Sequence, residues 1–409
     1  MSNHVIDEAR RCLQCRNPKC TEGCPVRTDI RGAIALLKES KIEQAGELLF
    51  SNNPLSLVCS YVCPQESQCE GHCVLGLKGK PVQFSIIENY ISDYYLNIID
   101  GQTGVQPPSG MKVAVIGSGP AGVTISFILA KKGYDVTIYE GNEKIGGVMR
   151  YGIPEFRLPK MVLDRLKTAL IKYGVKIRPN TNIGTNLNID DFFRDGCKSV
   201  FIGTGVWRPN RLNLPGESFG NVHYAIDYLR NPDVYDLGDT VIVVGGGNTA
   251  IDVARTAIRK GSRHVSLVFN RGAEHLTASR EEIEFAKIDG VEFVYNKSTV
   301  RFLENGIAVR DCAESENGEI LEGEEESILP SDSTIIAVGQ GPRSVIVSST
   351  KGIDVNGRGL IAVDESGRTT RPGVYASGDV VTGAKTVVEA VKVSKRVAEA
   401  MDEYMKSLP

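Results

Sequence analysis

The sequence predicts an α/β protein in which a helical N-terminal domain precedes two domains built on parallel sheets. Three observations lead to this fold class. Eight of the ten cysteines lie between Cys12 and Cys73, in a region of helical pattern. Farther along, the apolar runs KVAVIG and TVIVVG each lead into glycines and then into a helix-like segment. Finally, 409 residues, of which 41% are hydrophobic and 24% charged, suffice for two or three globular domains.

The predicted helical domain is defined by its pattern and by the linker that follows it. In the segment IRGAIALLKESKIEQAGELL, apolar residues recur at helical spacing, and Thr28 or Asp29 is positioned to cap the start. The stretch GQTGVQPPSG, rich in Gly and Pro, predicts a linker. The segment GVYASGDV near the end is expected to return and complete the first nucleotide-binding domain. The predicted domains are 1–105 (helical), 111–237 with 341–409 (first nucleotide-binding) and 238–340 (second nucleotide-binding).

The cysteines follow two spacings, C-x2-C-x4-C-x3-C from Cys12 to Cys24 and C-x3-C-x5-C-x3-C from Cys59 to Cys73. Eight thiolates are enough to hold two 4Fe–4S clusters. Disulfides and structural zinc are the alternatives, but a cytosolic chain keeps its thiols reduced, and zinc sites more often use paired C-x2-C knuckles. We therefore predict iron–sulfur clusters. The candidate ligands are Cys12, Cys15, Cys20, Cys24, Cys59, Cys63, Cys69 and Cys73.

The first glycine motif carries the full fingerprint of a dinucleotide site. GSGPAG follows an apolar strand and opens a helix, and Glu140 ends the next strand. Glycines let the backbone approach a pyrophosphate at the helix N-terminus, while the acid accepts hydrogen bonds from ribose hydroxyls. Together with the later GGV, GTG and SGD segments, the motif predicts an FAD site. Its candidate residues are Gly117, Gly119, Pro120, Ala121, Gly122, Glu140, Gly147, Arg150, Gly205, Asp379 and Thr386.

A second motif, GGGNTA, repeats the strand–turn–helix pattern with alanine at the last glycine position, which is a permitted variant. It predicts a site for NAD(P)H. The following strand ends at Asn270 and Arg271, which offer one basic residue for a 2′-phosphate and no acid for a ribose hydroxyl. The residues at this strand end therefore favour NADH over NADPH. The candidate residues are Gly245, Gly247, Asn248, Thr249, Ala250, Asn270, Arg271 and Gly339.

Composition disfavours several classes of function. A net charge of -3 gives no reason to expect a nucleic acid or an anionic membrane as partner. The first residues lack the apolar core of a signal peptide, and no apolar stretch approaches the roughly 20 residues that span a bilayer, so we expect a cytoplasmic protein. No cysteine pair follows Gly146 and Gly147, as a disulfide reductase would need. We name no catalytic side chain, because hydride transfer is mainly the cofactors' own chemistry.

The chain resembles the glutamate synthase small-subunit family across essentially its whole length. The resemblance rests on both cysteine blocks and on GSGPAG, GGVMRYGIPEFRLPK, GGGNTAID and SGDVVTGAKTVVEAV. Within the family, the compact length and the ending GDVVTGAKTVVEAV are closer to the flavoprotein subunits of NAD-dependent dihydropyrimidine dehydrogenases. Members that use NADPH generally carry two basic residues where this chain has Asn270 and Arg271, so this departure also supports NADH.

The resemblance also implies how the clusters are held. One cluster would be bound by Cys12, Cys15, Cys20 and Cys73, and the other by Cys24, Cys63, Cys69 and the non-cysteine ligand Glu88. Counting cysteines alone would choose Cys59 instead of Glu88, and we keep both as candidates.

The function implied by the resemblance is electron input to a larger enzyme. NAD(P)H would reduce FAD, and two 4Fe–4S clusters would pass electrons to a partner subunit that carries FMN and the substrate site. The expected reaction is reduction of a pyrimidine to a dihydropyrimidine. The alternatives are the small subunit of glutamate synthase and a subunit of a flavin-based transhydrogenase. A rival from another class is a redox-sensing module, against which the intact nicotinamide motif argues.

Overall fold

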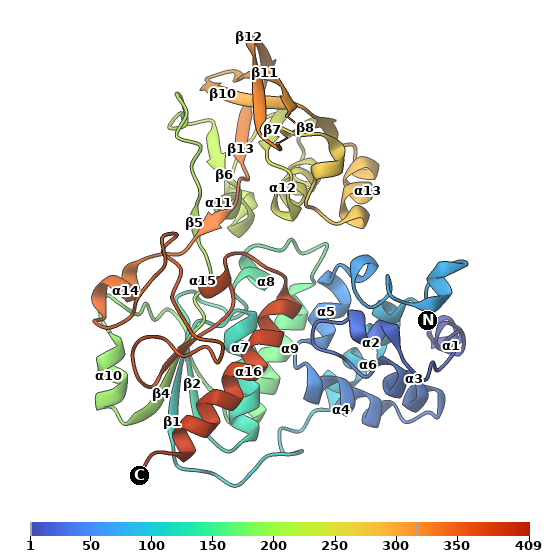
Figure 1. Cartoon of the computed structure of the whole chain (residues 1–409), viewed down its shortest axis with the longest axis vertical. Helices are drawn as coiled ribbons and strands as arrows, with labels where there is room; N and C mark the ends of the chain where they lie inside the picture. The colour runs from blue at the N-terminus through green and yellow to red at the C-terminus, as the bar shows by residue number, and fades with distance from the viewer. Residues whose placement is uncertain (1, 316) are drawn as a thin grey trace. The chain divides into compact units, whose positions relative to one another are not determined.

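The computed structural model describes residues 2–315 and 317–409 of the chain. These residues fall into two compact units, whose elements Figure 1 labels and colours along the chain. Unit 1 holds the residues up to Arg150, then Glu155–Val206 and Pro342–Pro409. Unit 2 holds Tyr151–Pro154 and Trp207–Gly341.

The N-terminal part of unit 1 is helical, as predicted. Its helices are α1 (Ser2–Arg10), α2 (Lys19–Gly23), α3 (Ile30–Lys38), α4 (Ile42–Asn52), α5 (Ser56–Val62) and α6 (Phe84–Ile98), with the 3₁₀ turns η1 (Gln65–Ser67) and η2 (Val74–Leu77). Asp29 caps α3, because its side chain accepts a hydrogen bond from the backbone N–H of Gly32 at 2.9 Å. Both α4 and α5 pack against α6. This packing buries apolar faces of helices that are too short to be stable alone.

A five-stranded parallel sheet forms the rest of unit 1. Its strands in spatial order are β15 (Val374–Ala376), β4 (Cys197–Ile202), β1 (Lys112–Ile116), β2 (Asp135–Tyr139) and β3 (Lys176–Arg178). The apolar strand β1 is buried from Val113 to Ile116, as expected of a strand covered on both faces. β15 lies near the C-terminus of the chain and pairs in parallel with β4. The chain therefore returns to its first sheet at the end.

Helices follow the strands of this sheet in the order typical of a doubly wound fold. They are α7 (Pro120–Lys131), α8 (Val148–Tyr151), α9 (Lys160–Lys172), α10 (Ile189–Arg194), α14 (Val345–Ser349), α15 (Asp379–Thr382) and α16 (Val387–Lys406). The long α16 packs along α7, as Figure 1 shows. α5 also contacts α16, so the helical region and the sheet region of unit 1 share an interface.

Unit 2 contains a second five-stranded parallel sheet. Its spatial order is β6 (Val222–Tyr224), β13 (Ser333–Ile336), β7 (Thr240–Val244), β8 (His264–Val268) and β9 (Glu292–Val294). The helices along this part of the chain are α11 (Ala225–Arg230), α12 (Asn248–Arg259) and α13 (Arg280–Asp289), with the turns η3 (Pro232–Val234) and η4 (Ala273–His275). β6 pairs with β13 although it precedes residue 238, where the second nucleotide-binding domain was expected to begin.

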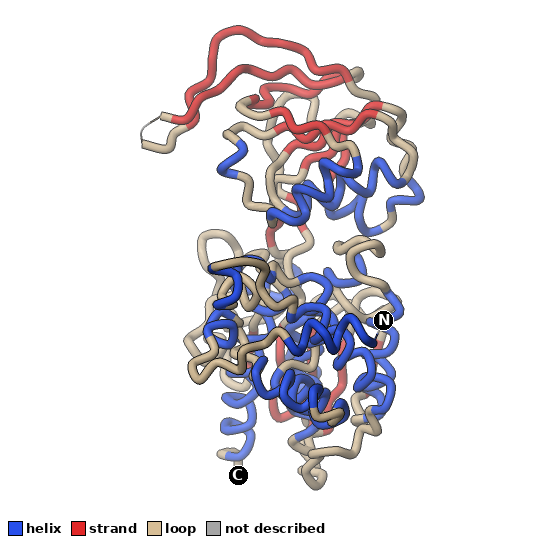
Figure 2. The backbone as a smooth tube through the Cα atoms, turned by 90° about the vertical axis from the view of Figure 1, so that its right-hand side faces the viewer, coloured by secondary structure: helices blue, strands red, loops and turns tan. Residues whose placement is uncertain are grey.

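Unit 2 also contains an antiparallel sheet of three strands, β10 (Lys297–Leu303), β11 (Gly306–Glu314) and β12 (Ile320–Pro330). A short pair, β5 (Arg208–Pro209) with β14 (Gln340–Gly341), completes the strands. Figure 2 shows β11 and β12 as long neighbouring strands. The edge strand β12 is exposed along most of its length and carries a run of glutamates, and such charges discourage pairing with another chain.

The predicted fold class can be compared with this architecture directly. The α/β class, with a helical N-terminal part and two parallel sheets that each lead into a glycine turn, is confirmed. Within the described residues, no helix combines the length and the apolar character that a membrane span requires.

Candidate functional site

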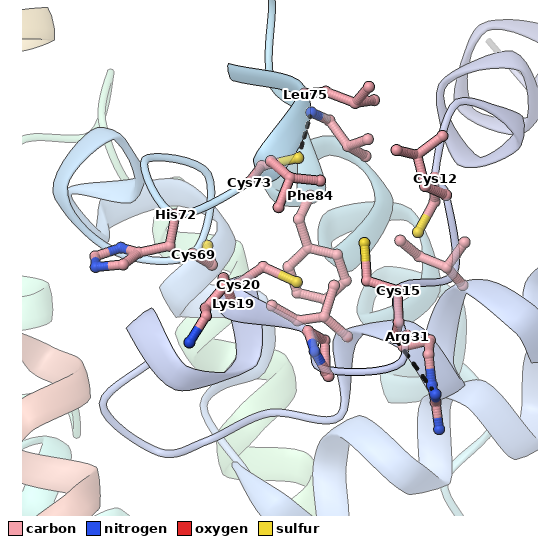
Figure 3. A pocket seen from close by; sticks show the side chains of 16 residues that line it. Cys12, Cys15, Lys19, Cys20, Arg31, Cys69, His72, Cys73, Leu75 and Phe84 are labelled. Atoms are coloured by element: carbon pink, nitrogen blue, oxygen red, sulfur yellow. Dashed lines mark hydrogen bonds between the residues drawn. The ribbon is translucent and has the colours of Figure 1, made fainter. Parts of the chain in front are cut away.

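Four cysteines from separate segments of the helical region meet at one pocket. Cys12 and Cys15 follow α1, Cys20 lies in α2, and Cys73 immediately precedes η2. All four line the pocket, as does Cys69, and the rest of the lining is largely apolar; Figure 3 shows these side chains. Burial raises the pKa of the Cys20 thiol to about 11, and the nearby Cys73 and Cys12 contribute to that rise. The pocket contains the whole first ligand set implied by the family resemblance together with Cys69 of the second set, so the division into two sets stays a prediction.

A second group lies where α5 and α6 meet the loop after α2. Burial raises the pKa of the Cys69 thiol well above its usual value, and the negative charges of Glu88, Glu70 and Cys24 raise it further. A hydrogen bond with Cys59, followed by burial, raises the pKa of Cys63, to which Glu88 and Cys69 also contribute. These electrostatic effects operate at short range, so the acids that they join lie near one another: Cys24, Cys59, Cys63, Cys69, Glu70 and Glu88.

Cys59 and Glu88 compete for the last position in this group. The buried sulfur of Cys59 accepts a hydrogen bond from Asn53 Nδ2 at 3.2 Å. Glu88 is only 8% exposed, and its carboxylate has no hydrogen-bond partner among the described residues. Burial raises the pKa of Glu88 well above its usual value. A buried carboxylate without a partner is costly unless it binds a cation, so Glu88 fits an iron ligand better than Cys59 does.

The donor set consists mostly of thiols, which are the usual ligands of iron–sulfur clusters. Across residues 2–315 and 317–409, no three His, Cys, Asp or Glu side chains have the arrangement that a single metal ion requires. A four-iron cluster spaces its ligands more widely than one ion does, and thiolates are its usual ligands. The thiols and the buried carboxylate of Glu88 would suit the predicted 4Fe–4S clusters.

The turn from β1 to α7 forms a cradle that requires glycine. Gly117 has a φ of 95°, and a Cβ there would lie 2.5 Å from the carbonyl oxygen of Gly203. A Cβ at Gly122 would lie 2.0 Å from the oxygen of Gly117. A Cβ at Gly147, whose φ is 52°, would lie 2.7 Å from the Cα of Gly119. Bare backbone at the N-terminus of a helix of 12 residues, opened by Pro120, is a good pyrophosphate site.

Asp379 lies at the same edge of the sheet. It begins α15 directly after β15, and the preceding Gly378 approaches the start of α7 so closely that an added Cβ would lie 3.0 Å from Ala121 Cβ. Burial raises the pKa of the Asp379 carboxyl to about 6. Its Oδ1 accepts a hydrogen bond from the backbone N–H of Lys385 at 3.2 Å. A half-buried acid beside the glycine cradle fits a hydroxyl donor of a bound dinucleotide.

Other residues predicted for the first site also support the local structure. Glu140 is buried and accepts two backbone N–H groups, at 3.0 and 2.8 Å. Arg150 donates from Nε to the carbonyl oxygen of Ile145 at 2.7 Å. Thr386 caps α16 by accepting a backbone N–H three residues on, at 3.3 Å. Gly205 has a φ of 70°, which favours glycine. The roles of these four residues toward FAD stay predictions.

The second glycine motif opens onto a cavity of about 410 Å³ in unit 2. Gly245 has a φ of 146°, and a Cβ there would lie 2.5 Å from the carbonyl oxygen of Ala337. Of the predicted residues, those that line the cavity are Gly245, Gly247, Thr249, Asn270 and Gly339. The other two of the motif face elsewhere: Asn248 accepts the N–H of Ser279 at 3.0 Å, and Ala250 is fully buried in the core.

Sequence reasoning missed the contribution of the antiparallel sheet to this cavity. Lys297, Ser298 and Thr299 of β10 line it. Lys297 is a cation that the strand-end pattern did not reveal, and it pairs with Asp311 at 2.7 Å. Arg271, next to Asn270, pairs with Glu314 at 3.3 Å. These contacts join segments that are distant in sequence, so no local pattern announces them.

Comparisons with known proteins agree with both halves of this arrangement. Residues 111–394 match the family model of the pyridine nucleotide-disulphide oxidoreductases. Residues 1–98 match a second model, described as dihydropyrimidine dehydrogenase domain II with a 4Fe–4S cluster.

Curated relatives are similar along nearly the whole chain. The chain is 31% identical to the glutamate synthase (NADPH) small chain of Escherichia coli K12, over 98% of this chain and 91% of that one. It is 32% identical to the NAD-dependent dihydropyrimidine dehydrogenase subunit PreT of the same organism, over 98% and 94%. Among solved structures, Mycobacterium tuberculosis FprA in complex with NADPH has a TM-score of 0.63 at 17% identity, over 74% of this chain and 85% of that one, which shows a shared fold.

Proposed function

Because the chain belongs to the glutamate synthase small-subunit family of pyridine nucleotide-disulphide oxidoreductases, as predicted, we propose that it carries electrons from NADH to a partner subunit. It is an oxidoreductase whose cofactors are FAD, a nicotinamide nucleotide and iron–sulfur of the 4Fe–4S type. Relatives named as a small chain and as a subunit support a catalytic partner. In the proposal that partner holds FMN and reduces a pyrimidine to a dihydropyrimidine.

Each cofactor has residues that fit it. When bound, FAD accepts a hydride from the nicotinamide and gives up its electrons one at a time. In the proposal, the backbone from Gly117 to Gly122 holds the pyrophosphate of FAD at the N-terminus of α7, and Asp379 accepts a hydroxyl hydrogen bond. In the same way, the turn from Gly245 to Gly247 holds the pyrophosphate of the nicotinamide nucleotide at the N-terminus of α12. The two thiol groups hold two clusters, and Glu88 rather than Cys59 completes the second.

The observation that carries the proposal is a chain of contacts that runs from the second thiol group to helix α16, which packs along α7. Cys24 Sγ lies 3.3 Å from Thr28 Oγ1, to which Asn52 Nδ2 donates at 3.4 Å. Lys395 Nζ on α16 donates in turn to Asn52 Oδ1 at 2.5 Å. α16 packs along α7, the helix that the glycine cradle opens, so these contacts link the second group to the helices of the proposed flavin site. This order supports electron flow from the flavin to the second group and then to the first.

The first thiol group lies beside a surface suited to a partner. Leu13 follows Cys12 and is 62% exposed, and Leu77, the last residue of η2, is 85% exposed. Arg16, Lys78 and Lys80 are exposed close by in the sequence, and within the described part of the chain none of them is paired with a carboxylate. We call these five residues the exit face. Exposed apolar side chains with unpaired cations close by in the sequence suit a partner that has an acidic docking surface.

The choice of NADH and of pyrimidine chemistry rests on finer features. Identities of 31% and 32% to the two kinds of relative do not separate them. The strand end at Asn270 and Arg271 lacks the paired cations expected of an NADPH-using member, and this supports the NAD-dependent subunit. A reducing compartment such as the cytoplasm suits the chain, because cluster ligands must stay reduced and none of its ten cysteines forms a disulfide.

Anaerobic stopped-flow reduction of the cluster-loaded chain tests the proposal. The chain would be mixed separately with NADH and NADPH, and bleaching of the flavin and of the broad cluster absorbance would be followed. We expect rapid bleaching of both bands with NADH and much slower bleaching with NADPH. A preference for NADPH would favour the glutamate synthase or transhydrogenase alternative, and no reduction by either nucleotide would contradict electron input altogether.

A further inference from the structure

We propose that Glu314 sets the nucleotide preference of this chain by holding Arg271 and presenting a carboxylate to the adenosine ribose. The inference rests on the proposed function, in which the turn after β7 binds NADH. Arg271 lies three residues beyond the end of β8, the second strand of the βαβ unit. In this fold, that position reads the ribose: an acid there binds the 2′-hydroxyl, and an arginine nearby binds a 2′-phosphate. At this position the chain has Asn270 and Arg271, so the arginine is present and the acid is absent.

The missing acid comes from another strand. Glu314 is the last residue of β11, and its Oε1 lies 3.3 Å from Arg271 Nη1. The second terminal nitrogen of Arg271 donates to the carbonyl oxygen of Gly318 at 3.3 Å. The other oxygen of Glu314 lies 3.0 Å from His275 Nε2. Both terminal nitrogens of Arg271 are therefore engaged, one by Glu314 at the end of β11 and the other by Gly318, two residues before β12.

The same strand, β11, also pairs with the cation that lines the cavity. Lys297 lines the cavity, and its Nζ lies 2.7 Å from Asp311, three residues before Glu314 on β11. A 2′-phosphate would have to displace these carboxylates or lie beside them, and like charges brought together are unfavourable. A ribose 2′-hydroxyl, by contrast, can donate a hydrogen bond to a carboxylate. Glu314 is thus placed to favour NAD(H) and to disfavour NADP(H).

Calorimetric binding of NAD⁺ and NADP⁺ to the anaerobic, cofactor-loaded chain tests this role without turnover. We expect Glu314→Gln to raise the affinity for NADP⁺ relative to NAD⁺ by about tenfold, because it removes a like charge and frees Arg271. The matched control is Glu326→Gln, which makes the same charge change on β12, where Glu326 pairs with Arg301 and Arg310. We expect this control to keep the wild-type ratio of affinities.

A double variant separates a specific role from a general charge effect. If Glu314 acts through Arg271, Glu314→Gln combined with Arg271→Gln loses the gain in NADP⁺ affinity. An unchanged ratio in Glu314→Gln, an equal change in Glu326→Gln, or a gain that persists in the double variant would overturn the inference. Loss of flavin reduction with nucleotide binding intact would instead contradict the proposed function and leave the role of Glu314 standing.

Discussion

At the scale of single residues, the unusual feature is a carboxylate buried among thiols. The charge of Glu88 raises the pKa of both Cys63 and Cys69, and the charge of Cys69 also raises the pKa of Cys63. Such a group of acids is stable as anions only around a cation. Cys59 differs, because its sulfur already has Asn53 and Cys63 as hydrogen-bond partners. The two residues are therefore expected to respond differently to substitution.

Replacing each residue in turn tests which one holds iron. We expect Glu88→Ala to lose about four iron atoms per chain, because a 4Fe–4S cluster missing one ligand is readily lost. Cys59→Ser, which keeps a hydrogen-bond acceptor for Asn53, should retain the full iron content. Iron analysis and the electron paramagnetic resonance spectrum of the reduced protein provide the measurement. Loss of iron in Cys59→Ser with full iron in Glu88→Ala would assign the ligand to Cys59.

At the scale of elements, the two strand–turn–helix units could be predicted, whereas the antiparallel sheet could not. KVAVIG and TVIVVG are continuous apolar runs that end in glycine, and this local pattern fixes β1 with α7 and β7 with α12. The contacts of β11 with Arg271 and Lys297 depend on how the chain folds back in space. The proposed grouping of the cysteines likewise interleaves the two blocks, which spacing alone does not specify.

The β1–α7 turn permits a test that separates folding from cofactor binding. A Cβ at Gly119 would meet no atom closer than 4.0 Å, whereas one at Gly122 would lie 2.0 Å from a backbone oxygen. We expect Gly119→Ala to leave the thermal stability of the FAD-free chain nearly unchanged while FAD content falls, because the side chain enters the space proposed for the pyrophosphate. Gly122→Ala should lower the free energy of unfolding itself, by roughly 2 kcal/mol or more.

The equivalent substitution in the other unit is the control for this test. Gly247→Ala, whose Cβ would lie 3.4 Å from Thr277 Oγ1, should keep FAD and weaken nicotinamide nucleotide binding. Flavin absorbance after desalting and a thermal melt of each variant provide the readouts. Full FAD content in Gly119→Ala would contradict the assignment of this turn to the flavin.

At the scale of the whole molecule, charge is unevenly distributed although the net charge is only -3. The segments 10–31 and 73–80, which carry the first thiol group, contain eight basic residues and two acids. Composition gave no reason to expect a charged partner, because the excess of cations here is balanced elsewhere, for example by the glutamates of β12. A local field of this kind steers oppositely charged partners toward one face.

Small electron acceptors of opposite charge test whether electrons leave through the exit face. We expect Lys78→Glu with Lys80→Glu to slow the reduction of anionic ferricyanide by about tenfold at low salt, while reduction of cationic hexaammineruthenium(III) is unchanged or faster. The difference should shrink as salt is raised to about 0.15 M, because exposed charges are then screened within about 8 Å. Flavin reduction by NADH, followed without acceptor, should not change.

Lys38→Glu with Lys41→Glu makes the same charge change in the same helical region but lies outside the pocket of the first thiol group. Equal slowing in this control pair would show that net charge, rather than the exit face, governs the reaction with acceptors.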